Sequence, residues 1–266
     1  MIVVGMGGSH LAADLLKLLK PDLDLTVYSD YGLLKSKPNE LVVLSSYSGN
    51  TEEVLDAYDK AAGLNRAIIT TGGQLLDKAK ADGVRYIQLP SKGLQPRDAV
   101  LFMLKTLYEL LGEDLKLPEA LELKDDISSE IANRIPLIYT SVKNEVLGYI
   151  WKIKFNETSK TPAFNNVLPE ADHNEINSFA KSKNFYCLFL KDESDHPQVK
   201  KRMDITAKLY CDIGIPCKII ELLGNSTLEK ICNQLALISV VTLNLAKIYE
   251  VDPNKVPMIE NLKKEL

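Results

Sequence analysis

Three hydroxyl side chains and a glycine follow a short apolar segment. Residues 41–44 are Leu-Val-Val-Leu, which predicts a buried strand, and Ser46, Ser48, Gly49 and Thr51 come directly after it. A helical pattern follows these residues. The start of a helix has unpaired backbone N–H groups and a partial positive charge. Hydroxyls and a glycine at such a junction suit a dianion such as phosphate.

This loop differs from the P-loop of nucleotide-binding proteins. It has no lysine and no G-x-x-x-x-G-K-[ST] pattern, so a neutral, hydroxyl-lined loop fits a phosphomonoester better than a triphosphate with Mg²⁺. The alternative is that Ser48 or Thr51 only caps the helix, as single hydroxyls often do. The combination of several hydroxyls with a glycine after an apolar strand favours phosphate binding.

A second group of candidates lies in the other half of the chain. Glu157 is predicted at a helix end, and His173 follows on a loop 16 residues later (173 − 157), so the two side chains could converge. A carboxylate can act as the base for a proton next to a carbonyl, and an imidazole can protonate a ring oxygen near neutral pH. The alternative is a solvated, charged loop.

The first ten residues comprise a predicted strand and the glycine-rich turn that follows it. This turn resembles half of a dinucleotide fingerprint, but the third glycine is missing, and no acidic residue follows a second strand at the usual distance. A loop for close approach of a ligand is favoured, with Gly7 and Gly8 exposing backbone and Ser9 offering a hydroxyl. We expect His10 to cap or pack at the following helix, and His196 to lie in a surface turn.

Strands and helices alternate along the whole chain. Predicted strands begin at Ile2 and Arg66 and occupy 25–28, 41–44, 84–89, 135–141, 185–190 and 216–222; predicted helices occupy 11–19, 53–62, 74–81, 98–111, 143–157, 198–213 and 225–249. This order predicts parallel sheets covered by helices on both faces, with ligands at the carboxyl ends of the strands. The two halves repeat one plan, so we predict two α/β domains, residues 1–115 and 116–266, joined by a charged connector.

Composition excludes several classes of function. The chain has 266 residues, 45% of them hydrophobic, and a net charge of −4. This argues against nucleic acid as the main partner, because a polyanion needs a basic face. The longest apolar runs are far shorter than a membrane span. The sequence begins on a predicted strand, so we expect no signal peptide and a cytoplasmic protein. Four cysteines without C-x-x-C spacing and only three histidines argue against a metal site.

Four segments carry a resemblance to a known family. They are residues 156–164 (NETSKTPAF), residues 168–176 (LPEADHNEI), residues 259–263 near the end of the sequence, and Gln95-Pro96-Arg97 before a long predicted helix. Together they resemble the bifunctional phosphoglucose/phosphomannose isomerases. That family is a branch of the sugar isomerase (SIS) superfamily, whose phosphate loop the segment SYSGNT also resembles. The resemblance implies two flavodoxin-like SIS domains. Members of the family usually carry a helical segment before the first strand and its glycine-rich turn. The given sequence begins on that strand, so the contacts of such a segment are expected to be absent.

The resemblance also implies roles for individual residues. Ser46, Ser48 and Thr51 would bind the 6-phosphate, and Gly8 and Ser9 would line the sugar. Glu157 would be the base that moves a proton between C1 and C2, Arg97 would stabilise the enediolate, and His173, supplied by the other subunit of a homodimer, would open the ring with help from Lys263 or its neighbour Lys264. Glu170, Asp172 and Glu175 would either shape the loop or support the residues that touch the substrate.

The implied reaction interconverts glucose 6-phosphate and mannose 6-phosphate with fructose 6-phosphate through a cis-enediol, with no metal and no cofactor. Two alternatives remain open at this point. SIS domains also serve as phosphosugar sensors that bind without turnover, and other SIS isomerases act on different sugar phosphates. The absence of a DNA-binding helix-turn-helix and the negative charge argue against a sensor that regulates transcription.

Overall fold

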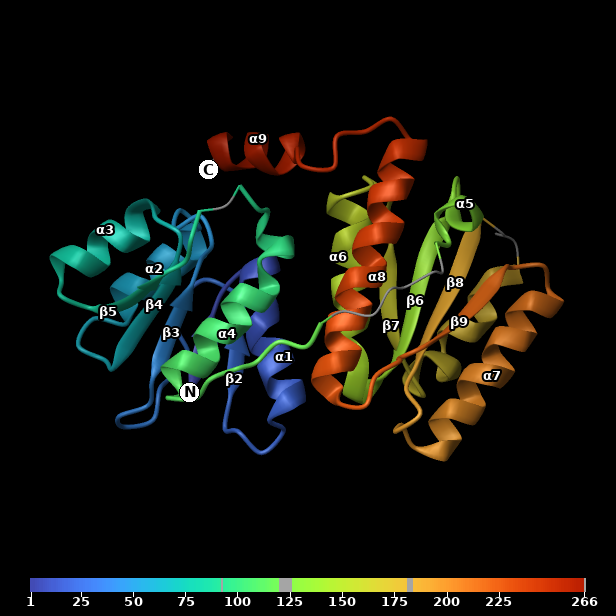
Figure 1. Cartoon of the computed structure of the whole chain (residues 1–266), viewed down its shortest axis with the longest axis horizontal. Coiled ribbons are helices and arrows are strands. Elements are labelled where there is room, and N and C mark those ends of the chain that lie inside the picture. Colours follow the sequence, from blue (N-terminus) through green and yellow to red (C-terminus); the bar gives the residue numbers. More distant parts are fainter. Residues whose placement is uncertain (92, 120–125, 181–183, 266) are drawn as a thin grey trace. The chain divides into compact units, whose positions relative to one another are not determined.

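The computed structural model describes residues 1–91, 93–119, 126–180 and 184–265. The chain divides into two compact units, Met1–Lys116 and Leu117–Leu266. Each unit is built on its own parallel sheet flanked by helices, which confirms the predicted α/β fold class (Figure 1). The division between the units falls one residue after the predicted boundary at residue 115.

The N-terminal unit has a five-stranded sheet in which all neighbouring strands are parallel. Its strand order is β2-β1-β3-β4-β5. The strand order reverses between β1 and β3, which is where open parallel sheets bind their ligands. The strands are β1 (Ile2–Val4), β2 (Thr26–Tyr28), β3 (Val42–Ser45), β4 (Arg66–Thr70) and β5 (Arg85–Gln88).

Helices cover both faces of this sheet. In Figure 1, α2 and α3 lie on one face and α1 and α4 on the other. In α1, Leu11, Leu15 and Leu16 recur at helical spacing and are fully buried, so the amphipathic pattern of the sequence becomes the contact with the sheet. The helices are α1 (Leu11–Leu19), α2 (Glu52–Lys60), α3 (Gly73–Ala81) and α4 (Val100–Leu110), with short 3-10 turns η1 (Gly7–Ser9) and η2 (Pro96–Asp98).

The C-terminal unit has a four-stranded sheet in the order β7-β6-β8-β9, again entirely parallel. The strands are β6 (Ile135–Ser141), β7 (Phe164–Leu168), β8 (Phe185–Lys191) and β9 (Cys217–Glu221). The helices are α5 (Ser128–Ile131), α6 (Glu145–Glu157), α7 (Pro197–Asp212), α8 (Thr227–Ile248) and α9 (Pro257–Glu265), with 3-10 turns η3 (Val142–Asn144), η4 (Glu170–His173) and η5 (Glu175–Ala180).

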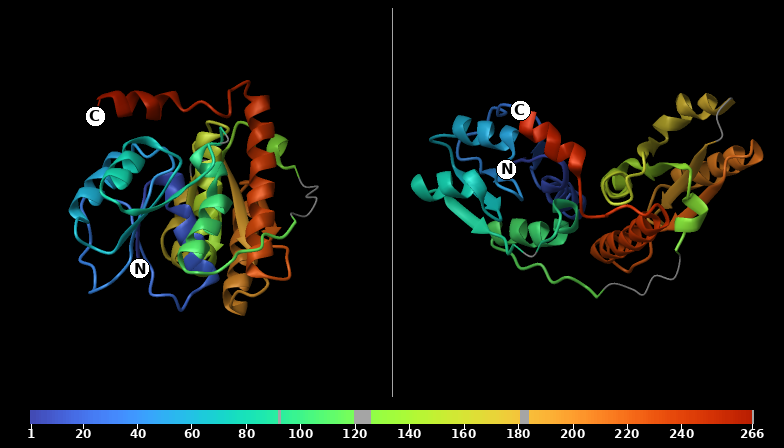
Figure 2. Two further views of the ribbon diagram at one scale, coloured as in Figure 1. Left: turned by 60° about the vertical axis from the view of Figure 1, so that its left-hand side comes forward. Right: turned by 90° about the horizontal axis from the view of Figure 1, so that it is seen from above.

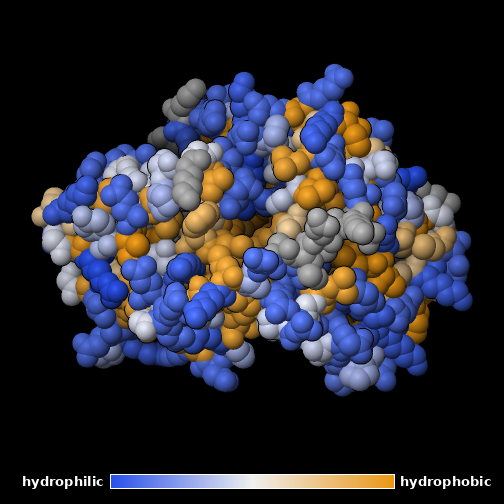
Figure 3. Space-filling view, in the orientation of Figure 1, coloured by the Kyte–Doolittle hydropathy of each residue, from blue (hydrophilic) through white to orange (hydrophobic). Residues whose placement is uncertain are grey.

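The two faces of this second sheet are covered by different helices. Figures 1 and 2 show α6 and α8 on one face and α7 on the other. Beneath α7, Tyr139 and Phe189 from neighbouring strands stack with ring centroids 5.0 Å apart, and Tyr210 of α7 packs against both rings. Hydrophilic residues dominate the surface over α7 in Figure 3. Beneath this surface, burial of the three aromatic rings holds α7 to the sheet.

Helix α8 differs from the sequence-based expectation about apolar runs. It is long and apolar enough to cross a membrane by length and composition, although the sequence was expected to hold no run of that length. In its most apolar window 56% of the residues are buried, and Ile238, Val241 and Leu245 are fully buried. Burial of this kind is typical of a core helix in a folded domain.

The structure contains elements that the sequence did not predict, among them α5, β7 and α9. Strand β7 occupies Phe164–Leu168, within a segment that was interpreted as a polar loop. Its centre is Asn165 and Asn166, a residue type depleted in strands, and β7 forms at the edge of the sheet by pairing with β6. Helix α9 occupies Pro257–Glu265, which was predicted only as a tail.

A buried carboxylate lies at the carboxyl end of β8. Asp192 has a side chain that is 3% exposed, and its Oδ1 accepts hydrogen bonds from Lys230 Nζ at 2.6 Å and from Ser194 Oγ at 2.8 Å. Lys143 Nζ lies 3.3 Å from its Oδ2. Burial alone would raise the pKa of Asp192, but the bonds from Lys230 and Ser194 bring that pKa well below its ordinary value. The carboxylate therefore stays ionised and connects β8, α8 and η3.

We expect Lys230→Met to lower the free energy of unfolding by about 3 kcal/mol, because removing one partner of a buried ion pair leaves a desolvated charge. The loss should be measured by urea denaturation at pH 7. The folded-state pKa of Asp192 lies below its unfolded value, so the stabilisation is complete above about pH 4 and is lost as the pH falls. Lys255→Met is the control, since Lys255 is 77% exposed; an equal loss in both variants would contradict the prediction.

Candidate active site

The predicted phosphate loop lies at the carboxyl end of β3. Ser46 is fully buried, and its Oγ lies 2.8 Å from the Oγ1 of Thr51. The same Ser46 Oγ accepts a hydrogen bond from the N–H of Gly49 at 3.1 Å. Ser48 is exposed and its Oγ accepts from the N–H of Asn50 at 3.2 Å. The loop therefore curls so that the Ser46 and Thr51 hydroxyls meet at its base.

The structure bears on the alternative that these hydroxyls only cap a helix. Thr51 does occupy the N-cap position of α2, but its side chain makes no capping hydrogen bond and pairs with Ser46 instead. Glu52 and Glu53 stand in the first turn of α2, where they complement the helix dipole and would repel an anion. Any anion bound here would therefore depend on hydroxyl and N–H donors rather than on local positive charge.

A second loop supports the first through very close backbone contact. A Cβ on Gly49 would lie 1.7 Å from the carbonyl oxygen of Gly72, and one on Gly73 would lie 2.5 Å from the carbonyl oxygen of Ser48. Gly49 has φ +70 and Gly73 has φ +72, a region that favours glycine. The N–H of Leu75 donates to Gly49 O at 2.9 Å. The loop after β4 therefore determines the shape of the loop after β3.

The glycine-rich turn after β1 joins the same edge of the sheet. Ser9 Oγ accepts a hydrogen bond from the N–H of Tyr47 at 3.0 Å, and Ser45 Oγ donates to the Ser9 carbonyl at 2.8 Å. A Cβ on Gly8 would lie 2.8 Å from the backbone nitrogen of Arg97, whose side chain is buried. The structure thus brings Gly8, Ser9 and Arg97 to the end of the sheet that carries the hydroxyl loop.

His10 does not serve the role of a capping side chain. It occupies the N-cap position of α1 without a side-chain cap bond, and its Nδ1 lies 2.6 Å from Asp14 Oδ2. It is largely buried, in agreement with the expectation that it packs at this helix. His196, expected in a surface turn, does cap a helix: its Nδ1 accepts from the N–H of Gln198 at the start of α7.

In the C-terminal unit, Glu157 is the last residue of α6. The turn that follows is held by several bonds. Asn156 Oδ1 accepts from the N–H of Ala163 at 3.0 Å, and Ser159 Oγ donates to Phe155 O at 2.9 Å. Lys160 Nζ donates to the carbonyl oxygen of Glu157. Lys160 had no predicted role, although its position two residues before Pro162 indicates a turn at this point.

His173 ends the 3-10 turn η4 and is exposed. The neighbouring Asp172 connects this turn to α7, because its oxygens accept from Arg202 Nη1 and Thr206 Oγ1, each at 2.9 Å. The turn follows directly after β7 and the cis peptide bond between Leu168 and Pro169. Asp172 therefore has the loop-shaping role expected of it, and His173 is presented to solvent.

Glu157 and His173 do not converge within one chain. Strands β6 and β7 are parallel and are joined by α6, so α6 ends at the amino edge of the sheet, whereas η4 follows the carboxyl end of β7. Five-residue β7 separates these edges, a rise of about 13 Å. The sequence spacing suggested convergence, and the parallel connection prevents it within a single subunit.

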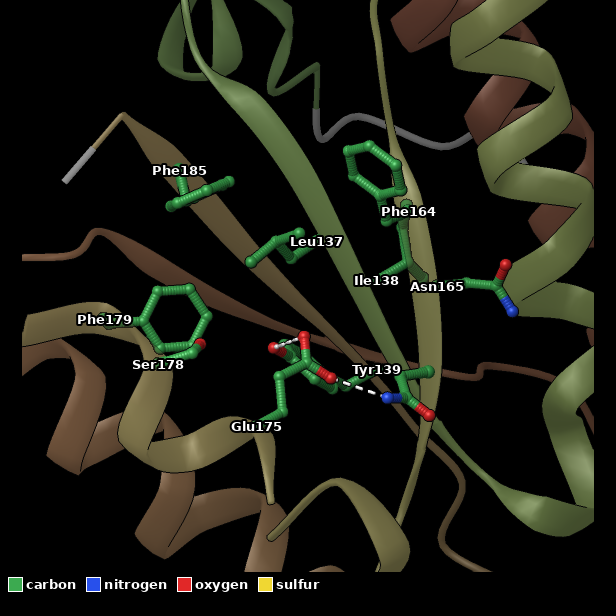
Figure 4. A pocket seen from close by; sticks show the side chains of 10 residues that line it. Leu137, Ile138, Tyr139, Phe164, Asn165, Glu175, Ser178, Phe179 and Phe185 are labelled. Atoms are coloured by element: carbon green, nitrogen blue, oxygen red, sulfur yellow. Dashed lines mark hydrogen bonds between the residues drawn. The ribbon is translucent and has the colours of Figure 1, made fainter. Parts of the chain in front are cut away.

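Glu175 lies in a pocket of about 500 Å³ beside β6 and β7 (Figure 4). Its Oε1 accepts from Tyr139 Oη at 3.1 Å and its Oε2 accepts from Asn166 Nδ2 at 2.6 Å. Figure 4 shows Phe179 of η5 and Phe185 of β8 among the side chains that line this pocket. The Glu175 carboxylate thus joins η5 to both strands, as expected for a residue that shapes the loop.

The last two candidates lie on α9 of the C-terminal unit. Lys263 is exposed, and the side chain of Lys264 lies outside the described part of the structure. Within the ranges that the structure describes, no group of three or more His, Cys, Asp and Glu side chains could hold a metal ion.

Comparison with known proteins defines the class first. Residues 122–266 match the family model described as a bacterial phospho-glucose isomerase C-terminal SIS domain. A solved structure, a hypothetical protein from Thermus thermophilus, has the same fold with a TM-score of 0.76 at 16% identity, covering 98% of this chain and 81% of that one. The protein is therefore an SIS-domain protein.

Whole-chain relatives then give the family. A bifunctional phosphoglucose/phosphomannose isomerase from Aquifex aeolicus is 36% identical, covering 100% of this chain and 90% of that protein. One from Caldicellulosiruptor bescii is 35% identical and covers 100% and 89%. The chain belongs to the bifunctional phosphoglucose/phosphomannose isomerase family, which confirms the resemblance seen in the sequence.

The contact between the two glycine loops gives a test of stability. We expect Gly49→Ala to destabilise the N-terminal unit by about 3 kcal/mol or more, because the new Cβ meets the Gly72 carbonyl and the residue keeps a positive φ. Gly63→Ala is the matched control: Gly63 has φ +79 but nothing within 4 Å of the added Cβ, so only strain of about 1 kcal/mol is expected. Urea denaturation of both variants measures the difference, and equal losses would contradict the steric explanation.

Proposed function

We propose that this protein is an aldose–ketose isomerase that interconverts glucose 6-phosphate and mannose 6-phosphate with fructose 6-phosphate. The observation that carries the proposal is the neutral hydroxyl loop after β3, in a chain of this family. The Thr51 hydroxyl is engaged with Ser46 rather than with the helix cap. Such a loop suits a phosphomonoester, because hydroxyl and N–H donors at a helix start can surround phosphate oxygens.

In this proposal the N-terminal unit binds the phosphate end of the substrate. Ser46, Ser48 and Thr51 bind the 6-phosphate, and Gly8 and Ser9 line the sugar. The close contact of the two glycine loops supports this assignment, because a loop shaped by backbone contact needs little reorganisation on binding. The phosphate group is remote from C1 and C2, so these residues contribute to binding rather than to the chemical step.

The chemical step moves one proton between neighbouring carbons. The Glu157 carboxylate removes the C2 proton of the open-chain aldose, and the C–H electron pair forms the C1=C2 double bond of a cis-enediolate. The hydroxyl proton of O2 then passes to O1, and as the carbonyl forms at C2 the carbon-bound proton returns from Glu157 to C1. A carboxylate held by the end of α6 supports this role, because a general base must keep a constant position through both half-steps.

The enediolate carries a negative charge that needs stabilisation. Arg97 is assigned this role, since a guanidinium offers several N–H donors and a positive charge to an anion. Only 2% of Arg97 is exposed, and charge stabilisation is stronger where water is excluded. Proton transfers between carboxylate, imidazole and ammonium groups complete the reaction without a metal or a cofactor.

Ring opening is assigned to His173 with help from Lys263 or Lys264. We propose that the active protein is a homodimer and that His173 of the partner subunit acts at the site of each Glu157. The opposite edges that Glu157 and His173 occupy in one chain support this arrangement. The exposure of His173 also agrees with a role outside its own subunit.

A coupled assay for fructose 6-phosphate tests the function. We expect turnover of glucose 6-phosphate and of mannose 6-phosphate, each supplied alone, in buffer that contains EDTA. Turnover of only one sugar would contradict the dual specificity, and activity lost to EDTA but restored by Zn²⁺ would contradict the metal-free mechanism. Thermal stabilisation by either sugar phosphate without turnover would instead identify a phosphosugar sensor.

The base is tested by Glu157→Gln, which keeps the shape of the side chain and removes its proton-accepting charge. We expect kcat to fall by about 10³-fold, with thermal stabilisation by fructose 6-phosphate unchanged, because the phosphate contacts remain. Glu193→Gln is the control, since the Glu193 side chain is 85% exposed and forms an ion pair with Lys200. Near-wild-type kcat in Glu157→Gln would remove Glu157 from the mechanism.

A further inference from the structure

The turn after α6 contains a lysine in an unusual backbone conformation. Lys160 has φ +57, in the left-handed region that glycine normally occupies where a helix ends. A side chain there brings its Cβ close to the backbone and strains the chain. Strain at a non-glycine residue points to a function when the side chain itself makes specific contacts.

The side chain of Lys160 makes such a contact. Its Nζ donates a hydrogen bond to the carbonyl oxygen of Glu157, the residue assigned as the base. This bond closes the segment from Glu157 to Lys160 into a small ring of chain. The carbonyl of Glu157 is one of the last of α6, where the helix ladder ends, so the lysine fills a position that water would otherwise occupy.

Other hydrogen bonds hold the remaining residues of this turn. Ser159 is fully buried and bonded to the Phe155 carbonyl, and the N–H of Thr161 also donates to Phe155 O at 3.0 Å. Asn156 holds the N–H of Ala163. In addition to these contacts, the hydrogen bond from Lys160 Nζ restrains the backbone of Glu157 itself.

Charge gives a second reason for a lysine at this position. The carboxyl end of a helix carries partial negative charge, which disfavours a carboxylate. Glu157 is placed at that end of α6. The ammonium of Lys160 on the terminal carbonyl offsets this field, and a lysine near a helix carboxyl end is favourable for the same reason.

We propose that Lys160 is a positioning residue that holds the backbone and carboxylate of Glu157 in the orientation required for proton transfer. This inference rests on the proposed isomerase function. From this left-handed turn the Lys160 ammonium reaches back to the Glu157 carbonyl.

Lys160→Gly separates this role from a structural one. Glycine accepts φ +57 without strain, so the melting temperature should stay equal or rise. We expect kcat in the coupled assay to fall by about 10- to 100-fold, with KM changing by less than threefold, because the phosphate loop is untouched. Lys160→Arg keeps a cationic donor of similar reach and should retain most of kcat.

Two further measurements make the result decisive. Combined with Glu157→Gln, Lys160→Gly should cause no additional loss, since it acts through that carboxylate. Lys152→Met is the charge control, because Lys152 lines the same open pocket of about 510 Å³ as Lys160 but is bonded to no helix carbonyl in the described contacts; its kcat should be unchanged. Any of three results would overturn the proposal. They are a wild-type kcat in Lys160→Gly, an equal loss of kcat in Lys152→Met, and an additive loss of kcat in the double variant. An inactive wild-type protein would instead overturn the proposed function.

Discussion

The parallel direction of every strand is the constraint on which the arrangement of functional residues depends. In the N-terminal sheet it sends the turns after β1, β3 and β4 to one edge, and this is why three separate loops can form one hydroxyl-lined surface. In the C-terminal sheet the same constraint separates residues. A helix that connects two parallel strands must return to the amino edge, so Glu157 at its end lies far from His173 after the next strand.

Much of the fold was predictable because apolar strands and amphipathic helices carry strong periodic signals. The hydroxyl loop was also predictable, since its residues are contiguous. Strand β7 was not, because Asn165 and Asn166 oppose strand formation and only pairing with β6 imposes it. The left-handed Lys160 and the contact of Gly49 with Gly72 depend on positions that no local pattern encodes. The separation of Glu157 from His173 followed from topology, which their spacing in sequence does not reveal.

The two units use equivalent places in opposite ways. Strand β3 lies beside β1 as β8 lies beside β6, each on the side away from the second strand of its unit. After β3 the chain presents uncharged hydroxyls from Ser46 and Thr51, whereas after β8 it buries the Asp192 carboxylate against Lys230. A buried carboxylate repels phosphate oxygens. The loop after β8 therefore serves stability through its ion pair, whereas the loop after β3 presents uncharged hydroxyls.

The contact between Gly49 and Gly72 also divides the hydroxyl loop into positions that can and cannot be redesigned. Ser46 is enclosed, and Gly49 has no volume for a side chain. Ser48 and Asn50 are exposed on the same short segment. A library that alters the ligand preference of this protein should therefore vary these two outward positions and leave the inner ones constant. The same backbone contact means that inserting a residue into either loop requires a matching change in the other.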